Sequence, residues 1–365
     1  MKIVIAAWHL KDFNVGLARY CQGLIEAIGR VDSKNRYEIW IPDGRINFSD
    51  RPNFHYRVIR FPLFKRRLWG QLAPLLVGPY DILHFPHDSS VIWKRGKFLV
   101  TIHDVKPLLF PLSSRSWNMN RGIQRMVVPD RCKQADQILT ISQWSRRDLI
   151  ERLGVRPERI SVVYPGVDLE KFKPIGDNQG NEKGKGPFIL SVAGGDPTKN
   201  LEVLIQAFSL LSPFVQERYN LILAGDLRRR GDLRQLVDQM GLEKYVVFTG
   251  TVPDERLVEL YQQASVFVYP SLYEGFGLPV LEAMACGCPV ICSNRSTLPE
   301  VVDDAGVLVD PTEPKILSAA IEEVLTNIPH RRRLREKGLD RVRRFSWDRT
   351  ASELLTVYQR VGQLN

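Results

Sequence analysis

Residues 266–282 read VFVYPSLYEGFGLPVLE, an apolar run followed by two glycines and a proline. The run VFVYP is typical of a strand buried in a parallel sheet. Gly275 and Gly277 allow the backbone to turn tightly and to approach a ligand. Pro279 suits the first position of a helix, and Gly287 suits the position after its end. The stretch therefore predicts a strand, a tight loop and a helix, which is the repeating unit of an α/β fold.

The start of this predicted helix is also a candidate binding site. Free N–H groups at Phe276, Gly277 and Leu278 would face an anion. Glu282 is expected in the first helical turn, where its carboxylate can accept two vicinal hydroxyls, and Glu274 lies in the loop. Two carboxylates around an anion-binding helix start fit the sugar, phosphates and ribose of a sugar nucleotide. The alternative is an ordinary loop with a capping glutamate.

A second phosphate-binding candidate follows the strand FILSV at residues 188–192. The loop GGDPTK leads into a helix opened by Asn200, and Lys199 would bring an ammonium group to the same sheet edge. The alternative is a solvated lysine at a helix start, a position that is mildly unfavourable for a cation. The glycine pair beginning at Gly194 is not a GxGxxG fingerprint, so we expect no nicotinamide cofactor.

The first half of the chain carries two further candidates. FLVTIHDV places His103 and Asp104 just past a buried strand, where α/β enzymes often hold site residues. The alternative for His103 is a core histidine bonded to backbone. In NVGLARY, Gly16 begins a helix where it can approach a phosphate. Arg19, in the first turn, is either a ligand-binding group or a surface cation.

Strand and helix patterns alternate along the whole chain, which predicts parallel sheets with helices between their strands. A length of 365 residues suggests two domains. The segment PIGDNQGNEKGKGP (174–187) has no periodic apolar pattern, so we interpret it as the linker between a domain at 1–173 and a domain at 188–344. Twelve runs are predicted as strands: KIVIAAW, YEIWIP, DILHF, FLVTIH, QILTIS, ISVVY, FILSV, LILAG, VVFTG, VFVYP, PVICS and GVLVD.

Charge is distributed unevenly between the two halves. Residues 1–170 contain 27 Lys and Arg against 16 Asp and Glu, whereas residues 171–330 contain 14 against 21. This asymmetry points to an anionic partner for the first half only. The opening run is too short and too soon interrupted by charge for a signal peptide, and no apolar run is long enough to span a bilayer. We therefore expect a cytoplasmic protein with reduced cysteines.

Together these motifs resemble the family-4 (group 1) glycosyltransferases of the GT-B fold. EGFGLPVLE is similar to the E-x7-E motif of that family. VVFTGTVPDERLVELYQQASVFVYPS (246–271) and ACGCPVICSNRSTLPEVV (285–302) also resemble it. The resemblance implies two Rossmann-like domains facing a central cleft. It also implies that a C-terminal helix, at about residues 345–365, crosses back to the first domain. The implied activity is retaining transfer of a sugar from a nucleotide-diphosphate donor.

The resemblance also implies roles for individual residues. Glu282 would hold the ribose hydroxyls, Glu274 the donor sugar and His103 the sugar near its anomeric centre. Lys199 would neutralise the diphosphate of the leaving nucleotide. Residues that would line the rest of the donor site are Gly16, Arg19, Gly194, Phe248, Gly250, Phe276, Gly277 and Leu278.

One departure from the family bears on the donor. Many members carry an arginine five residues before the lysine, where this chain has Gly194, and Thr198 replaces another common basic residue. Lys199 is then the one cation expected from this loop. A subgroup that resembles O-antigen mannosyltransferases also has glycine there, which favours GDP-mannose. No Asp-x-Asp motif stands at a strand end, so we expect transfer without a metal or another cofactor.

The acceptor is not encoded in a recognisable motif. FPLFKRRLWGQLAPLLVGP (61–79) combines aromatic anchors with basic residues, as segments that lie on anionic lipid do. We expect a glycan or lipid-linked acceptor and a peripheral position on the inner face of the membrane. The alternative for this segment is an amphipathic helix that covers the sheet.

Two other function classes remain to be weighed. A nucleotide-sugar epimerase would use a similar fold without an acceptor. A nucleic-acid-binding protein is suggested by HRRRLREK (330–337), but this run is amphipathic and precedes the last helix, which favours a solvated face. We therefore expect no nucleic-acid partner.

Overall fold

The computed structural model describes residues 1–11, 16–41, 48, 51–59, 78–87, 91, 94–110, 128–175 and 186–363. It divides into two compact units, Met1–Gly166 with Phe345–Asn365, and Val167–Arg344. Most of the expected linker at 174–187 lies outside the described residues, as do residues 61–77 of the segment that is expected to contact membrane.

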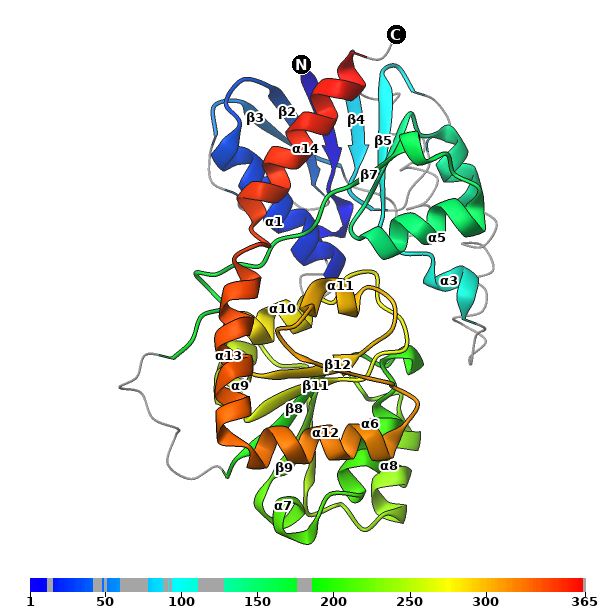
Figure 1. The fold of residues 1–365 in the computed structure, drawn as a ribbon. Coiled ribbons are helices and arrows are strands. Elements are labelled where there is room, and N and C mark those ends of the chain that lie inside the picture. The colour runs from blue at the N-terminus through cyan, green and yellow to red at the C-terminus, as the bar shows by residue number, and fades with distance from the viewer. Residues whose placement is uncertain are drawn as a thin grey trace. The chain divides into compact units, whose positions relative to one another are not determined.

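The first unit is built on a parallel sheet, which has seven strands among the described residues. Helices follow its first, fifth and sixth strands along the chain, and among the described residues none stands between the second and the fifth (Figure 1). In spatial order the strands are β3 (Phe54–Val58), β2 (Arg36–Ile41), β1 (Lys2–Ala6), β4 (Ile82–Phe85), β5 (Lys97–Ile102), β6 (Gln137–Thr140) and β7 (Ile160–Val162). The helical elements are η1 (Trp8–Lys11), α1 (Gly16–Val31), α3 (Lys106–Leu109), α5 (Gln143–Leu153), η3 (Pro157–Arg159) and α14 (Trp347–Gly362).

The last helix, α14, packs against α1 and β4 of this first unit. Gly23 of α1 leaves room for the Trp347 ring, because a Cβ atom at that glycine would lie 2.3 Å from the indole. Arg30 at the end of α1 forms an ion pair with Asp348 at 2.7 Å. The two helices therefore pack closely, because the Trp347 side chain of α14 fits against the backbone of α1 at Gly23.

The second unit is built on a second parallel sheet, six-stranded in the described part of the chain. Its strand order is β10 (Val246–Gly250), β9 (Asn220–Ala224), β8 (Phe188–Val192), β11 (Val266–Tyr269), β12 (Val290–Ser293) and β13 (Val307–Val309). The helical elements are η4 (Pro197–Lys199), α6 (Leu201–Ser209), α7 (Pro213–Arg218), α8 (Gly231–Gln239), α9 (Asp254–Gln263), α10 (Leu278–Ala285), α11 (Leu298–Val302), α12 (Pro314–Thr326) and α13 (Ile328–Val342).

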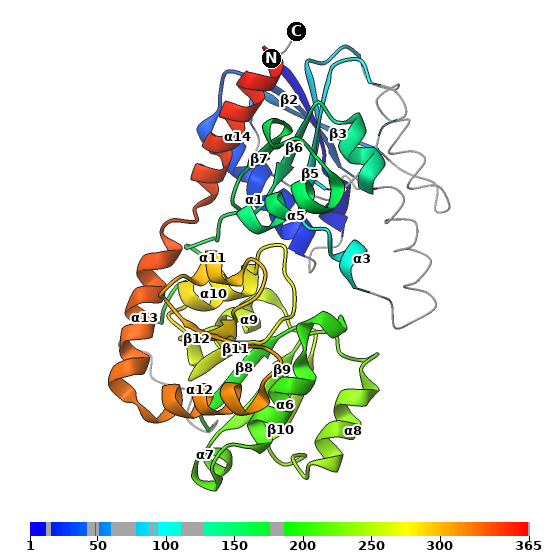
Figure 2. The ribbon, with the colours of Figure 1, turned by 45° about the vertical axis from the view of Figure 1, so that its right-hand side comes forward.

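Helices cover both faces of the second sheet (Figure 2). One face of α6 is apolar and buried, with Leu204, Ile205 and Phe208 at 0% exposure. These side chains join one core with α8 and α12, and α9 and α10 lie against strands of the same sheet. The strand order reverses between β8 and β11, the kind of position where open α/β sheets bind ligands.

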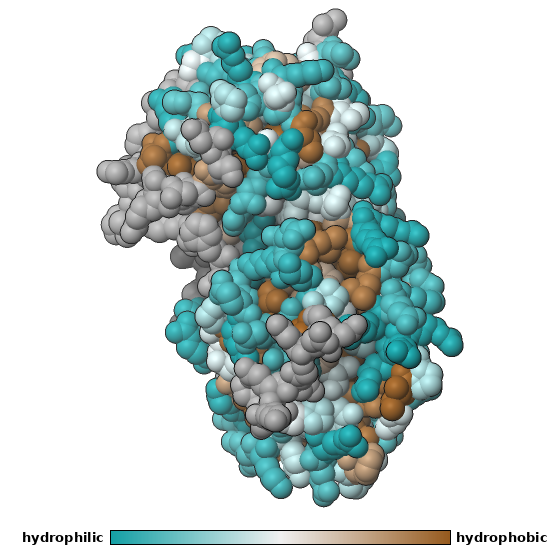
Figure 3. Space-filling view, turned by 90° about the vertical axis from the view of Figure 1, so that its left-hand side faces the viewer, coloured by the Kyte–Doolittle hydropathy of each residue, from teal (hydrophilic) through white to brown (hydrophobic). Residues whose placement is uncertain are grey.

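Among the helices of the described residues, none combines the length and the apolar character needed to cross a membrane. On the face drawn in Figure 3, the described residues are mostly hydrophilic, and the hydrophobic ones form small separate groups.

A substitution at Gly225, the residue after β9, would test how closely the loops of the second sheet pack. Its φ is 129°, and a Cβ atom there would lie 2.0 Å from the carbonyl oxygen of Ala193. We expect Gly225→Ala to lower the free energy of unfolding by about 3 kcal/mol, because backbone strain and steric overlap each cost roughly 1–3 kcal/mol. Gly241 is the matched control. Its φ is also positive, at 65°, but nothing lies within 4 Å. Urea unfolding of Gly225→Ala and Gly241→Ala should therefore give clearly different losses, and equal losses would contradict the packing argument.

Candidate functional site

The site in the second unit forms where two loops meet at the carboxyl edge of its sheet. One loop follows β8 and the other follows β11, the two strands at which the strand order reverses. The backbone N–H of Leu272 donates to the carbonyl oxygen of Thr198 at 2.8 Å. Asn200, at the N-cap of α6, does not cap its helix, because its side-chain amide donates to the carbonyl oxygens of Pro270 (3.1 Å) and Pro311 (2.6 Å). These bonds fix the two loops to each other.

Lys199 and Glu274 meet across this junction. The Lys199 Nζ atom lies 2.6 Å from Glu274 Oε1, with side-chain exposures of 17% and 10%. Lys199 also donates to the Tyr269 hydroxyl at 2.6 Å. Burial and the charge of Glu274 hold the pKa of Tyr269 well above its usual value, so the phenol stays protonated. The structure thus brings together a lysine and a glutamate that are 75 residues apart in the sequence, and the pair is largely buried.

Two serines fix Glu274 in place. Ser271, which is fully buried, donates to Glu274 Oε1 at 2.5 Å. The backbone N–H of Glu274 donates to Ser296 Oγ at 3.0 Å. Ser271 and Ser296 did not stand out in the sequence, because serine is common in loops and neither residue forms part of a recognisable spacing.

The helix after this loop begins at Leu278, one residue before Pro279. Gly277 precedes it with a φ of 106°, and a Cβ atom there would lie 2.7 Å from the Leu298 side chain, so the expectation of a glycine-dependent turn is confirmed. The placement of Glu282 in the first turn is wrong. Because the helix begins one residue before the proline, the glutamate is its fifth residue and lies just beyond the first turn, which contains no acidic residue.

Glu282 is nonetheless held in a defined position. It is 4% exposed, and its Oε2 atom accepts a hydrogen bond from the Tyr261 hydroxyl of α9 at 3.1 Å. Tyr261 is itself fully buried. Pairing with a buried hydroxyl lowers the cost of burying the carboxylate. Sequence reasoning missed Tyr261, since it reads as one more apolar position of an amphipathic helix.

The other predicted donor-site residues of this unit lie along the same sheet edge. Gly194 follows β8, and Phe248 and Gly250 end β10, where Gly250 has a φ of 71°. Nothing would meet a Cβ atom at Gly194 or Gly250 within 4 Å, so the backbone there borders open space. The Arg234 guanidinium lies over the Phe248 ring, with its Cζ atom 4.4 Å from the ring centroid.

In the first unit, the predicted residues follow the carboxyl ends of β1 and β5, which are separated in the sheet by β4. Gly16 begins α1 with open space beside it, and Arg19 is half-buried in the first turn. His103 follows β5, and its Nε2 atom lies 2.9 Å from the carbonyl oxygen of Pro86. Because a carbonyl can only accept, Nε2 carries the proton in that contact.

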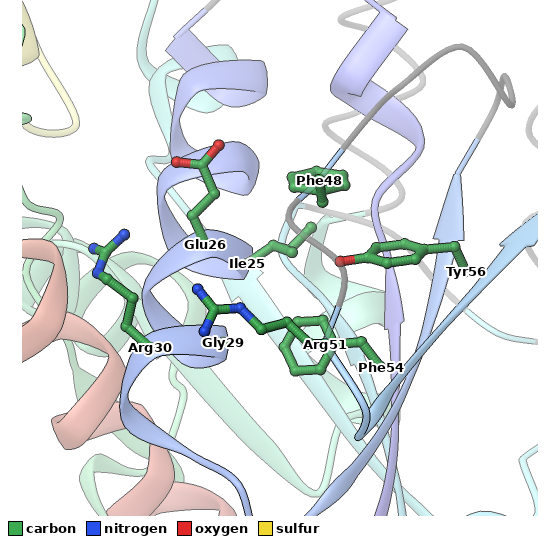
Figure 4. Close-up of a pocket in the computed structure, with 8 residues that line it drawn as sticks. All are labelled: Ile25, Glu26, Gly29, Arg30, Phe48, Arg51, Phe54 and Tyr56. Carbon is green, nitrogen blue, oxygen red and sulfur yellow. The ribbon is translucent and has the colours of Figure 1, made fainter.

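A cavity elsewhere in the first unit is too small for a sugar nucleotide. It lies between α1 and β3 and is lined by Gly29, Phe48, Phe54 and Tyr56 among others (Figure 4). Its volume is about 80 Å³, room for only a few water molecules. Among the described residues, no three His, Cys, Asp or Glu side chains are grouped so that they could hold a metal ion.

The basic run in HRRRLREK lies on α13, where several of its neighbours are acidic. Lys337 pairs with Asp304 at 2.6 Å, and Arg341, just beyond the run, pairs with Asp303 at 3.2 Å. These cations are engaged within the unit, which fits the interpretation as a solvated helix face.

Two parallel α/β units, the second with a lysine–glutamate pair at its topological switch point, define the GT-B class of enzyme. A family profile described as glycosyl transferases group 1 matches residues 173–341, and one described as glycosyltransferase family 4 matches residues 18–171. O-antigen chain mannosyltransferase B of Escherichia coli is 30% identical over 98% of this chain and 100% of its own length. The chain therefore belongs to this family and is a glycosyltransferase.

Solved structures agree with the fold. Sucrose-phosphate synthase from Thermosynechococcus elongatus has a TM-score of 0.78 at 22% identity, with 99% of each chain covered. HepE of Anabaena, solved in complex with UDP-glucose, has a TM-score of 0.74 at 18% identity, covering 99% of this chain and 100% of its own. At these identities the likeness establishes the fold alone.

Proposed function

We propose that this glycosyltransferase moves a hexose, mannose by preference, from a nucleotide-diphosphate sugar to a glycan or lipid-linked acceptor in surface polysaccharide synthesis. The observation that carries the donor class is the Lys199–Glu274 pair at the switch point, with Glu282 held on α10, the helix that follows the Glu274 loop. Mannose, and GDP-mannose as donor, are supported by the similarity to a mannosyltransferase and by glycine at position 194.

The lysine is the proposed electrostatic catalyst. When the donor bond breaks, negative charge develops on the leaving nucleoside diphosphate, and the Lys199 ammonium would stabilise it where it forms. In the structure Lys199 forms an ion pair with Glu274 at 2.6 Å. An incoming diphosphate would therefore compete with Glu274 for the lysine, while Ser271 keeps its bond to the carboxylate. This exchange would leave Glu274 available to a donor-sugar hydroxyl.

The remaining donor contacts follow from position. Glu282 would accept from the ribose hydroxyls, and Phe248 and Gly250 would border the base. Amides at Phe276, Gly277 and Leu278 would bind the sugar and diphosphate. His103, Gly16 and Arg19 of the first unit are proposed to contact the donor around its anomeric centre.

The reaction is proposed to retain the anomeric configuration and to need no metal. The acceptor hydroxyl would attack from the face that the diphosphate leaves, so the departing group itself can take the acceptor proton. The acceptor would bind to the basic first unit, and contact with anionic lipid on the inner face of the plasma membrane would bring a lipid-linked acceptor to it.

The proposed function is tested by a donor screen followed by product analysis. GDP-mannose should raise the melting temperature more than UDP-, ADP- or dTDP-sugars at equal concentration, since a ligand stabilises by mass action. Radiolabelled mannose should then appear in an acceptor glycan. Label that appears only in an altered nucleotide sugar would favour the epimerase alternative, and a melting temperature unmoved by any donor would count against the donor site.

A further inference from the structure

A chain of buried polar side chains crosses the first unit from its last helix to its first. The Tyr358 hydroxyl on α14 lies 2.7 Å from His84 Nδ1 on β4. His84 Nε2 lies 3.0 Å from Thr101 Oγ1 on β5. The Thr101 hydroxyl is in turn hydrogen-bonded to the hydroxyl of Tyr20 on α1. Figure 1 shows α14 lying beside α1 in this unit.

The members of this chain are almost completely buried, with exposures of 0% at Tyr358, His84 and Thr101 and 2% at Tyr20. Burial lowers the pKa of His84 to about 3, so the ring is neutral at physiological pH. A neutral imidazole has one donor and one acceptor, and each hydroxyl has both. The chain is therefore satisfied when all its protons point in the same direction, and a break at one link leaves a neighbour unsatisfied.

The chain ends against the predicted catalytic histidine. The Tyr20 ring meets the His103 ring edge-on, with centroids 4.7 Å apart and an interplanar angle of 87°. A charge on His103 disfavours a charge on His84, so the two imidazoles interact electrostatically as well. The backbone of His103 is held separately, because Ser145 Oγ donates to its carbonyl oxygen at 3.0 Å. The His103 ring itself contacts the Tyr20 ring and the Pro86 carbonyl oxygen.

We propose that the chain Tyr358–His84–Thr101–Tyr20 is a positioning device through which the C-terminal helix sets the His103 ring. This inference rests on the proposed role of His103 in transfer. Tyr358 is then a positioning residue that acts on the donor sugar without touching it. If the chain served stability alone, its loss would lower the melting temperature but leave the His103 ring and the chemical step unchanged.

The experiment compares Tyr358→Phe and Thr101→Val with Thr140→Val. Thr140 is the matched control because it is fully buried on the adjacent strand β6 and donates one hydrogen bond, to the Ile102 carbonyl, outside the chain. We expect Tyr358→Phe and Thr101→Val to lower kcat about three- to tenfold with KM for the donor within about twofold. Thr140→Val should change neither kcat nor KM. Thr101→Ser, which keeps the hydroxyl, should have the kcat of the wild-type protein.

A second readout does not depend on activity. The imidazole of His103, assigned by comparison with His103→Gln among the six histidines, is titrated by NMR. Its pKa should move in Tyr358→Phe and stay in Thr140→Val. If both chain variants match Thr140→Val in kcat and in the His103 titration, the positioning device is refuted. If wild-type protein transfers no sugar, the proposed function fails, and the titration still decides whether the chain acts on His103.

Discussion

Replacing Lys199 with alanine is expected to lower kcat for sugar transfer by about 10²–10³-fold, the range seen when one charge-stabilising donor is removed from an active site. The physical reason is the developing charge on the leaving diphosphate, which would lose the ammonium proposed to meet it. In the same variant Glu274, 7% exposed, loses its cation at 2.6 Å, while its hydrogen bond from Ser271 remains. The measurement is steady-state transfer of labelled sugar, together with the donor dissociation constant.

The control separates catalysis from the loss of an ion pair. Lys337 pairs with Asp304 at the same distance, 2.6 Å, on exposed α13. Lys337→Ala should leave transfer within about twofold, because exposed pairs contribute roughly 0–1 kcal/mol. The double variant Lys199→Ala/Glu274→Gln removes the buried charge as well. It should recover melting temperature relative to Lys199→Ala without recovering activity. Activity that returns with stability would show that the lysine is only structural.

The parallel sheets were predictable because their central strands are buried on both faces and read as continuous apolar runs. All twelve predicted strands are present within the described residues. The strand β3 was not predicted, and it shows why a local sequence pattern can miss a strand. It lies at the edge of its sheet, its residues are half-buried or exposed, and His55 and Arg57 interrupt any apolar run. An edge strand is defined by its pairing with β2, which a local pattern does not record.

The candidate site was predictable to the extent that its residues carry local meaning. Glu274, Gly277 and Lys199 each stand at a strand or helix end, where the backbone itself suggests a ligand. The sequence did not reveal which hydrogen bonds hold these residues in place. The bonds from Ser271 to Glu274 and from Tyr261 to Glu282 connect residues on different elements or across a loop. The relative place of Tyr358, His84 and Tyr20 likewise depends on tertiary packing, since these residues are far apart in the chain.

Replacing Glu282 with glutamine is expected to weaken donor binding by roughly 10- to 100-fold, because hydrogen bonds to a charged acceptor contribute more than neutral ones. The amide keeps the size of the carboxylate but presents one acceptor and one donor group to the ribose. The effect should fall mainly on the donor dissociation constant, measured by calorimetry, since ribose binding is the same before and during bond breaking.

The nucleotide itself provides the sharpest test of this role. If Glu282 accepts from the ribose hydroxyls, wild-type protein should bind a 2′,3′-dideoxynucleoside diphosphate much more weakly than the ribonucleotide. Glu282→Gln should bind the two with nearly equal affinity, because the interaction is already lost in the protein. Tyr261→Phe removes only the hydroxyl that holds the carboxylate at 3.1 Å. Its preference for the ribonucleotide should lie between those of wild type and of Glu282→Gln. A Glu282→Gln variant that still discriminates as wild type does would place the ribose elsewhere along the sheet edge.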